Sequence, residues 1–469
     1  MAIAPWAVDP AAPDVPTYPE VDGDMKRLYA SEFVSPLTRS SDTKFVASCL
    51  TMKSFRKLVA AGLVFLVGFM FPAATAWPEI PWDVRQFAAP PRVYTAPGLH
   101  EEGVRAFFFE GPPWQGKPTR IFAWYGAPLY REAQTVPALV LVHGGGGTAF
   151  ASWVRLWNSR GYAAIVIDTC GNLPIPAENH GWQRNPNGGP PCWDASFDQI
   201  DWPEKDQWTY QAVAAIILAN SLLRSFPEID SKRIGITGIS WGGYLTAISA
   251  SVDRRFRFAA PVYGCGFLGE DSYWLPQFKK MGDAKSRKWL GLWDPSVYLR
   301  KAKMPFLWVD GTNDEFYPLD SLKMSYLLPQ GPRTLSIHMR MPHNHEEGEQ
   351  PDEIRAFADH LLQSGAPLAS VRVQSRRGLS VWMRYRTKVP IVRAELNFTS
   401  DSGIWHQRQW NTVPAELDPG KHEVRATLPE SVTAYYFNLL DERGLIVSSD
   451  LQISGVAPRE VLLAWLHFI

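Results

Sequence analysis

The chain has 469 residues, with 47 lysines and arginines against 47 aspartates and glutamates, so its formal net charge is zero. This balance excludes the basic surface that binding to nucleic acid or to an anionic membrane requires. Hydrophobic residues make up 46% of the chain and charged residues 20%, which indicates folded domains with substantial cores. The four cysteines exclude a disulfide scaffold and a zinc module built from paired cysteines.

An export signal is predicted inside the N-terminal region, over residues 52–76. A basic start is followed by an apolar run over residues 58–71, which is too short to span a membrane comfortably, and by small residues at 74–76. We expect cleavage after residue 76 and a secreted or periplasmic protein with no membrane association afterwards; the alternative is an uncleaved anchor or a core helix. Residues 1–51 are either a disordered leader or an extension upstream of a true start at Met52.

Short buried strands alternate with helices in the predicted elements of residues 77–366. The predicted strands are 104–109, 119–125, 138–142, 162–167, 233–237, 258–262, 306–309 and 334–339, and the predicted helices are 151–160, 209–223, 241–252 and 350–362. The first two strands form a hairpin, and several later strands are continuous apolar runs typical of strands buried on both faces. This order predicts an α/β fold with a mostly parallel sheet wrapped by helices.

Residues 367–455 show a different pattern, without helices. Short strands are predicted at 380–384, 394–399, 423–428, 435–439 and 445–449. Several alternate in polarity and are separated by turn residues, which favours a small antiparallel β-sandwich. We expect this sandwich to stabilise the protein rather than to bind glycan, since a fold alone does not give a function. An apolar tail follows at residues 456–469.

A G-x-S-x-G pattern, Gly238-Ile239-Ser240-Trp241-Gly242, lies between a predicted strand and a predicted helix. In this context the serine hydroxyl is held in a tight turn, where glycines avoid collisions with neighbouring backbone. The helix N-terminus behind the serine offers unpaired N–H groups to a developing oxyanion. The alternative is a glycine-rich turn with an idle serine. We predict that Ser240 is a nucleophile.

A second glycine-rich segment, His143-Gly144-Gly145-Gly146, directly follows a buried strand. Glycines there allow backbone N–H groups to approach a ligand. We predict an oxyanion hole formed by the N–H of Trp241 together with the N–H of Gly145 or Gly146. The alternatives are a flexible turn or a phosphate-cradling loop. The latter is disfavoured because no Gly-Lys-Ser or Gly-Lys-Thr follows.

A serine nucleophile needs a base and a carboxylate that orients the base. The strand at 306–309 leads to Asp310 and Asp314, and after the next strand come His343 and His345. We assign the acid to Asp314, because a carboxylate at a strand end such as Asp310 more often braces its loop. We assign the base to His345 rather than His343, although their closeness in sequence prevents a clean separation. This chemistry requires no metal and no cofactor.

With these motifs, the sequence resembles the α/β-hydrolase superfamily, and within it the bacterial secreted acetylxylan esterases and the related prolyl-oligopeptidase-like hydrolases. The resembling stretches are residues 137–150, 206–230, 233–250, 259–268, 310–319 and 340–348. The acid pattern of this group, Asp-x-x-x-Pro, matches Asp314 with Pro318. Its base pattern, x-Gly-His-x-x-Gly, matches His345 with Gly348, except that Asn344 replaces the first glycine. The resemblance implies the α/β-hydrolase fold and acyl transfer through an ester of serine.

Two aromatic-rich insertions, at residues 171–208 and 268–300, are expected to shape the substrate cleft. Trp182, Trp193 and Trp274 are candidate platforms for sugar rings. The alternative, which is at least as well supported, is that these tryptophans pack inside the small cores of the insertions themselves.

Two cysteines, Cys170 and Cys192, bracket part of the first insertion. They can pair in an oxidising compartment, but two cysteines in a sequence do not give the separation of their Cβ atoms. We therefore leave the pairing open. If it forms, Cys265 remains as a buried thiol.

The motifs and the export signal predict a secreted serine carboxylesterase. The resemblance implies that it deacetylates a plant or algal polysaccharide or its oligosaccharides, so its expected partner is an acetylated carbohydrate. One alternative is an oligopeptidase-like serine peptidase, although the sequence shows no propeller repeat to gate peptides. Another is a non-catalytic carbohydrate-binding protein in which the triad is dormant. The acyl group, the polysaccharide and the oligomeric state remain open.

Overall fold

The computed structural model describes residues 80–128, 135–178 and 181–454, which all belong to one compact unit. The predicted leader at 1–51, the predicted signal at 52–76 and the apolar tail at 456–469 lie outside these described residues. Within the described ranges, no helix combines the length and the apolar character needed to cross a membrane.

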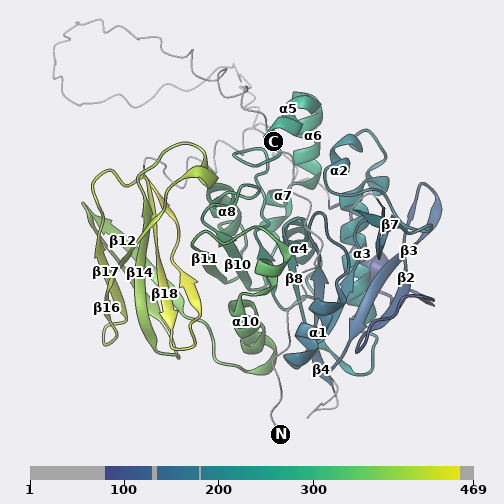
Figure 1. Cartoon of the computed structure of the whole chain (residues 1–469), viewed down its shortest axis with the longest axis horizontal. Helices are drawn as coiled ribbons and strands as arrows, with labels where there is room; N and C mark the ends of the chain where they lie inside the picture. Colours follow the sequence, from purple (N-terminus) through teal and green to yellow (C-terminus); the bar gives the residue numbers. More distant parts are fainter. Residues whose placement is uncertain (1–79, 129–134, 179–180, 455–469) are drawn as a thin grey trace, which may run out of the picture. The chain divides into compact units, whose positions relative to one another are not determined.

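A large mixed sheet forms the centre of the fold (Figure 1). Its strands begin, in spatial order, with β1 (Val93–Thr95), β2 (Arg105–Trp114), β3 (Lys117–Gly126), β5 (Ala163–Ile167), β4 (Val136–Val142), β8 (Ile229–Ile239), β9 (Ala259–Val262), β10 (Phe306–Gly311) and β11 (Arg333–His338). The strands from β5 to β11 in this order are parallel, and β1, β2 and β3 are antiparallel. The predicted α/β class with a mostly parallel sheet is therefore confirmed.

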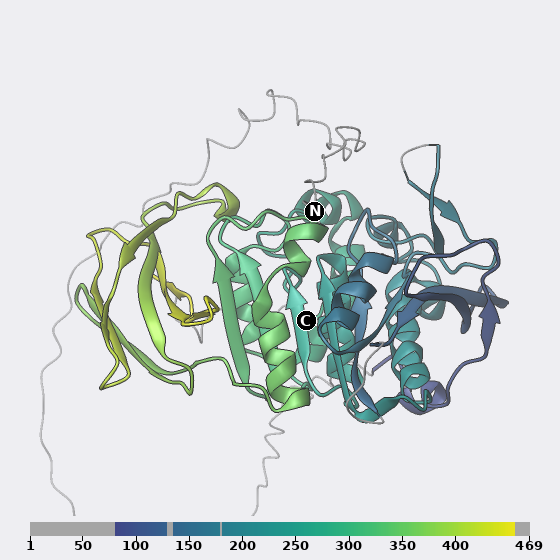
Figure 2. The ribbon, with the colours of Figure 1, turned by 60° about the horizontal axis from the view of Figure 1, so that its bottom comes forward.

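Helices cover both faces of this sheet (Figure 2). The α-helices of the described residues are α1 (Ala151–Ser159), α2 (Ala195–Asp198), α3 (Trp208–Leu223), α4 (Trp241–Val252), α5 (Leu275–Met281), α6 (Asp283–Trp293), α7 (Ser296–Leu299), α8 (Leu319–Tyr326), α9 (His345–Glu349) and α10 (Asp352–Gln363), and the covering helices include α1, α3, α4 and α10. Strand β4 is buried along its whole length, and its side chains alternate between two cores. Val140 packs in the core that contains α3 and α4, whereas Leu139 and Leu141 pack in the core that contains α1 and α10. This double burial explains the continuous apolar run in the sequence.

The two aromatic-rich insertions contain short elements that the sequence analysis did not predict. The first carries the hairpin β6 (Asn172–Pro176) and β7 (Trp182–Arg184), helix α2 and the 3₁₀ turn Glu204–Asp206. The second carries α5, α6 and α7. Both insertions follow the carboxyl ends of sheet strands, β5 and β9 respectively, which is the edge where ligands bind in such sheets.

After residue 366 the chain forms the predicted antiparallel β-sandwich. One sheet contains β12 (Ser370–Arg377), β13 (Ser380–Arg386), β17 (Glu423–Thr427) and β16 (Glu416–Asp418). The other contains β19 (Ile446–Ser448), β18 (Ala434–Asp441), β14 (Ile391–Thr399), β15 (Asn411–Pro414) and β20 (Gln452–Ile453). Val381 and Met383 of β13 share a buried cluster with Leu396 of β14 and Phe437 of β18, so the core lies between the two sheets.

The sandwich shares a sheet with the α/β region. Strand β19 pairs antiparallel with β11, with Leu335 opposite Ser448, so that the large sheet runs without a break from β1 to β15. The N–H of Ile337 donates to Ser448 Oγ at 2.8 Å, and the N–H of Ile446 donates to Glu353 Oε1 of α10 at 2.7 Å. These bonds join the two sequence regions across the boundary predicted at residue 366.

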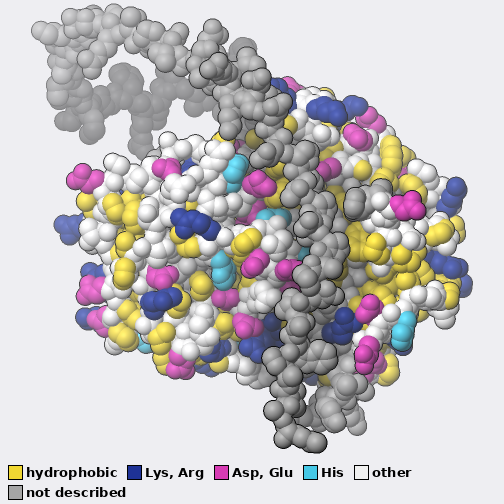
Figure 3. Space-filling view, in the orientation of Figure 1, with side chains coloured by type: hydrophobic (Ala, Val, Ile, Leu, Met, Phe, Trp, Pro, Cys, Tyr) yellow, Lys and Arg dark blue, Asp and Glu magenta, His cyan; other side chains and the backbone are white. Residues whose placement is uncertain are grey.

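Charged side chains are mixed in sign on the described surface that Figure 3 shows, with lysines and arginines interspersed among aspartates and glutamates. This arrangement agrees with the equal numbers of the two charges in the chain.

Candidate active site

Ser240 occupies a strained turn between β8 and α4. Its backbone angles, φ 58° and ψ −122°, lie in a region that residues other than glycine rarely adopt. The glycines of the pattern make the turn possible: a Cβ on Gly238 would collide with the carbonyl of Gly242, and a Cβ on Gly242 would collide with the carbonyl of Val142. The N–H of Ser240 donates to the carbonyl oxygen of Val262 in β9 at 2.9 Å, which fixes the turn to the neighbouring strand.

Ser240, His343 and Asp314 form a continuous hydrogen-bonded line. Oγ of Ser240 lies 2.8 Å from Nε2 of His343, and Nδ1 of His343 lies 2.5 Å from Oδ2 of Asp314. The Asp314 side chain is fully buried, whereas 15% of the His343 side chain is exposed. In this arrangement an imidazole can take a proton from a hydroxyl while a carboxylate holds the imidazole in the required tautomer.

The structure corrects the predicted base, because His343 and not His345 contacts Ser240. His345 is the first residue of α9, and its ring packs against Phe150 and Trp153, with ring centroids 4.4 and 4.9 Å away. His345 is therefore held among aromatic side chains next to α1, away from the hydroxyl that it was predicted to deprotonate.

The cause of this difference is Asn344. It is the N-cap of α9, with an extended backbone and a side-chain oxygen that accepts the N–H of Glu347 at 2.8 Å. The residue before an N-cap lies outside the helix, so His343 remains in the loop that follows β11 while His345 turns with the helix. An asparagine followed three residues later by a glutamate is a helix-start pattern, and this signal was present in the sequence.

The acid is held by its own loop. Oδ1 of Asp314 accepts the N–H groups of Phe316 at 2.9 Å and Tyr317 at 2.7 Å, which leaves Oδ2 for His343. Asp310 lies at the end of β10 and accepts the N–H of Gly311 at 2.7 Å, so it braces the loop instead. Burial raises the pKa of Asp310 well above its usual value, and the nearby charge of Asp314 adds to this effect.

Two aromatic rings that the sequence analysis missed pack against the His343 imidazole. The centroids of Tyr263 and Phe316 lie 4.3 and 4.5 Å from it. Tyr263 directly follows β9, has a φ of 29° and donates its hydroxyl to the carbonyl of Asn344. Burial is the main cause that raises the pKa of the Tyr263 phenol, so the hydroxyl stays protonated and keeps this bond.

The predicted oxyanion loop lies against the nucleophile. A Cβ on Gly144 would come 3.0 Å from Cβ of Ser240, and a Cβ on Gly145 would come 3.0 Å from the Trp241 ring. Trp241 begins α4, where a first-turn N–H has no partner within the helix. Gly146 has a φ of 71° and is the turning point of the loop. The loop and the helix start are thus brought together as predicted, and the roles of the three predicted donors stay a proposal.

A buried histidine fixes the start of this loop. Nδ1 of His143 lies 3.0 Å from the carbonyl oxygen of Gly144, and the N–H of Thr169 donates to Nε2 at 3.1 Å. Because Nε2 accepts, Nδ1 carries the proton and donates to Gly144. Burial lowers the pKa of His143 to about 4, so the ring is neutral at physiological pH. Nε2 lies 3.8 Å from the buried Asp168, whose pKa burial raises to about 6.

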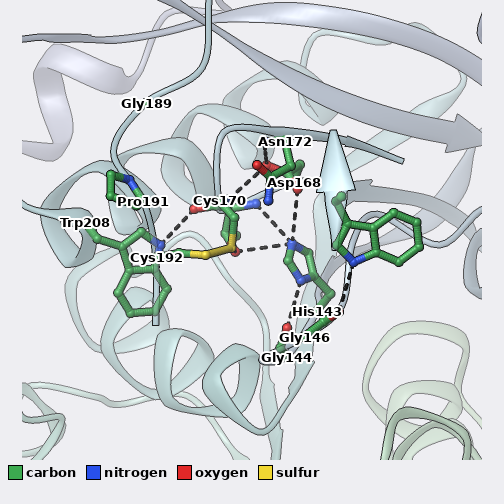
Figure 4. The surroundings of a disulfide bond; sticks show 12 residues. His143, Gly144, Gly146, Asp168, Cys170, Asn172, Gly189, Pro191, Cys192 and Trp208 are labelled. Carbon is green, nitrogen blue, oxygen red and sulfur yellow. Dashed lines mark hydrogen bonds and ion pairs between the residues drawn. A yellow bond between two sulfur atoms is a disulfide. The ribbon is translucent and has the colours of Figure 1, made fainter. Parts of the chain in front are cut away.

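Cys170 and Cys192 form a disulfide, with their Cα atoms 5.0 Å apart, and Cys265 is a buried free thiol. Figure 4 shows that the disulfide lies beside His143 and Asp168. Asp168 connects the two features, because its Oδ1 accepts the N–H of Cys170 at 2.9 Å. The disulfide therefore holds the first insertion close to the base of the glycine-rich loop.

The three predicted tryptophan platforms have different surroundings. Trp274 is only 3% exposed, donates its indole N–H to Asp194 and packs on Trp241 with centroids 4.6 Å apart. It fills the second insertion and has no open face for a sugar, so this part of the prediction is wrong. Trp182 and Trp193 are half-buried. They lie against the glycine-rich loop, where Trp182 donates to the carbonyl of Gly146 and Trp193 lies 4.0 Å from a Cβ built on Gly145.

Two family models match the chain. The model for acetyl xylan esterase matches residues 104–270, and the model for the prolyl oligopeptidase family matches residues 200–364. Each covers less than half of the chain, and they overlap at the turn that carries Ser240. The mixed sheet with helices on both faces and the two matches together identify the chain as a member of the α/β-hydrolase superfamily.

Individual relatives are distant. The uncharacterized peptidase YuxL of Bacillus subtilis (strain 168) is 25% identical over 227 residues, which cover 44% of this chain and only 30% of that relative. An acetyl xylan esterase from Paenibacillus sp. R4 is 21% identical with a TM-score of 0.48, covering 60% of this chain and 92% of its own. Acylaminoacyl peptidase from Pyrococcus horikoshii is 22% identical with a TM-score of 0.40, covering 56% of this chain and 40% of its own. Likenesses at this level do not assign an activity.

Proposed function

We propose that the protein is a secreted serine carboxylesterase that removes acetyl groups from a plant or algal polysaccharide or its oligosaccharides. The observation that carries the proposal is the 2.8 Å contact between Ser240 Oγ and His343 Nε2 on a strained turn. The match to the acetyl xylan esterase model, which includes Ser240, supports the choice of an acetyl ester.

In the first half of the proposed reaction, Ser240 Oγ attacks the acetyl carbonyl carbon as its proton moves to Nε2 of His343. The N–H of Trp241, with that of Gly145 or Gly146, donates to the negative oxygen of the tetrahedral intermediate. His343 then gives the proton to the leaving sugar oxygen, the carbon–oxygen bond breaks, and the acetyl group remains on Ser240.

In the second half, water attacks the acetyl-serine carbonyl and gives its proton to His343. The imidazolium returns this proton to Ser240 Oγ as the bond to the acetyl carbon breaks, and acetic acid leaves and ionises in solution, which restores the starting state. Asp314 accepts the N–H of Nδ1 at 2.5 Å and stabilises the imidazolium in both halves of the reaction.

The proposed secretion is supported by the disulfide between Cys170 and Cys192, since disulfides persist mainly outside the reducing cytosol. The predicted signal at 52–76 also supports secretion. N-terminal sequencing of the mature protein recovered from the medium or periplasm tests this expectation: the chain should begin at residue 77, and a chain that retains residues 52–76 would contradict it.

Acetate release from a panel of acetylated xylans and algal glycans tests the activity. We expect release by the natural chain, loss with Ser240→Ala, and no change with Ser152→Ala, which alters an exposed serine on α1. If Ser240→Ala binds glycan as the natural chain does and neither releases acetate, the protein is a carbohydrate-binding protein and the esterase proposal fails.

A serine peptidase is the second candidate, favoured by one observation. The prolyl oligopeptidase model spans Ser240, Asp314 and His343, whereas the acetyl xylan esterase model ends before the last two. Parallel assays on acetyl esters and on peptide anilides decide between them. Efficient anilide cleavage with negligible acetate release would favour the serine peptidase over the esterase.

A further inference from the structure

A cavity of about 610 Å³ lies beside the triad and is lined from two distant parts of the chain. Asp314, Phe316 and His343 line it from the α/β region, and residues 406–409 line it from the sandwich. We propose that this cavity is a subsite for the carbohydrate part of the substrate, with the sandwich loop 406–409 as one wall. The proposal rests on the function given above and gives the sandwich a part in substrate binding.

The position of this cavity agrees with the chemistry of the leaving group. In ester hydrolysis, the leaving oxygen must receive its proton from the same imidazole that first took the proton of the serine. The sugar therefore departs on the side of His343, whereas the carbonyl oxygen points to the glycine-rich loop. His343 lines this cavity and Ser240 does not, so a sugar bound there lies against the imidazole that protonates the leaving oxygen and leaves the nucleophile uncovered.

The loop is bound directly to the residue before the catalytic acid. Nδ2 of Asn313 donates to the carbonyl oxygens of His406 and Arg408, at 2.9 Å each. On the other side, Nη2 of Arg340 donates to the carbonyl oxygen of Trp410 at 2.7 Å. These three bonds hold the wall at a set position relative to Asp314. Such a fixed position is what a binding wall needs, since ordering a loop on binding would weaken affinity.

The lining has the mixed character that pyranose rings require, an apolar face and surrounding hydrogen-bonding groups. Phe316 is half-buried and supplies an aromatic ring next to His343. Gln407 and Gln409 are exposed and supply amide donors and acceptors for hydroxyl groups. The guanidinium of Arg408 is held 3.5 Å from the centre of the Trp405 ring.

The charges of the lining favour a neutral sugar. Arg340 and Arg408 are offset by the exposed Glu315 and by the buried Asp314, so the lining is formally neutral when His343 and His406 are neutral. An oligosaccharide of uncharged pyranoses, such as a xylo-oligosaccharide, fits this balance better than a chain of uronic acids.

The subsite is tested with Gln407→Trp, which fills the cavity, and with the pair Gln407→Ala and Gln409→Ala. The control is Gln86→Ala, an exposed glutamine of the 3₁₀ turn Val84–Phe87 outside the cavity lining. We expect each test variant to lower kcat/KM on an acetylated xylo-oligosaccharide by about tenfold, mainly through KM, and to change kcat/KM on 4-nitrophenyl acetate by less than about twofold. Equal losses on both substrates, or no loss on the oligosaccharide, would overturn the proposal.

Binding without turnover separates this proposal from the proposed function. In the Ser240→Ala background, calorimetry with unsubstituted xylohexaose should show binding that Gln407→Trp weakens by about tenfold and Gln86→Ala leaves unchanged. If the natural chain releases no acetate but this pattern holds, the proposed function fails and the subsite stands. Absent binding, binding indifferent to Gln407→Trp, or tighter binding of a uronate oligosaccharide would overturn the neutral-sugar subsite.

Discussion

The indole N–H of Trp182 donates to the carbonyl oxygen of Gly146 at 2.9 Å, which connects the first insertion to the glycine-rich loop beside Ser240. The neighbouring Gly144 and Gly145 lie against Ser240 and the Trp241 ring. A movement of the insertion therefore moves the amides that are proposed to hold the oxyanion.

Trp182→Phe should lower kcat by about fivefold on any acetyl ester while leaving the melting temperature nearly unchanged, because it removes one hydrogen bond worth about 1 kcal/mol and keeps an aromatic ring. Trp202→Phe, in the same insertion, is the matched control. Steady-state kinetics on 4-nitrophenyl acetate gives the readout. A rise in KM with unchanged kcat would instead assign Trp182 to substrate binding.

His343→Ala should lower kcat by about 10⁴-fold or more, because it removes the only histidine in contact with Ser240 among the described residues. His345→Ala should lower kcat by less than about tenfold, since it loses packing against Phe150 and Trp153 but no contact with the serine. Both variants are compared on one ester at one pH. The reverse order of effects would restore the sequence-based assignment of His345.

Stability should depend on pH through His143, whose pKa burial lowers from 6.5 to about 4. Between these values the unfolded chain binds a proton at this histidine that the folded chain does not, so His143 lowers the free energy of unfolding as the pH decreases from 6.5 towards 4. Asp168, whose pKa burial raises to about 6, acts in the opposite direction, and the comparison of variants separates the two. The full effect of His143 is about 3 kcal/mol. Urea denaturation of the natural chain and of His143→Gln, each at pH 7 and pH 4.5, isolates the contribution of His143. If the free energy of unfolding changes by the same amount between the two pH values in both proteins, the lowered pKa of His143 is contradicted.

Removal of the disulfide should destabilise the protein by about 3 kcal/mol, the effect expected for a closed loop of this size. The double variant Cys170→Ser with Cys192→Ser is the test, measured by denaturant unfolding with and without a thiol reductant. The natural chain should become less stable on reduction, and the double variant should not respond to the reductant. A response in the double variant would show that the reductant acts elsewhere.

The parts of the site that depend on local chemistry could be predicted from the sequence. Gly238 and Gly242 are required because backbone atoms occupy the space of a side chain, and this requirement is visible as a motif. Asp314 could be separated from Asp310 because a residue at the strand end and one in the loop beyond it have different surroundings. The buried strands were recognised for the same reason, since burial on both faces leaves a continuous apolar run.

The parts that depend on distant contacts could not be predicted. One difference has a local cause, because the cap at Asn344 separates His343 from His345 and was not considered in the assignment of the base. Trp274 is buried by residues of other segments, which no local pattern shows. The place of the loop 406–409 depends on bonds from Asn313, about ninety residues earlier, so a sequence reading has no means to find it.

The pairing of β19 with β11 has a consequence for dissecting this protein. A fragment ended at residue 366 would keep β10 on one side of β11 but would leave its other edge unpaired, with backbone groups near Leu335 and Ile337 open to other chains. Truncation at the apparent boundary should therefore yield aggregates rather than a smaller enzyme.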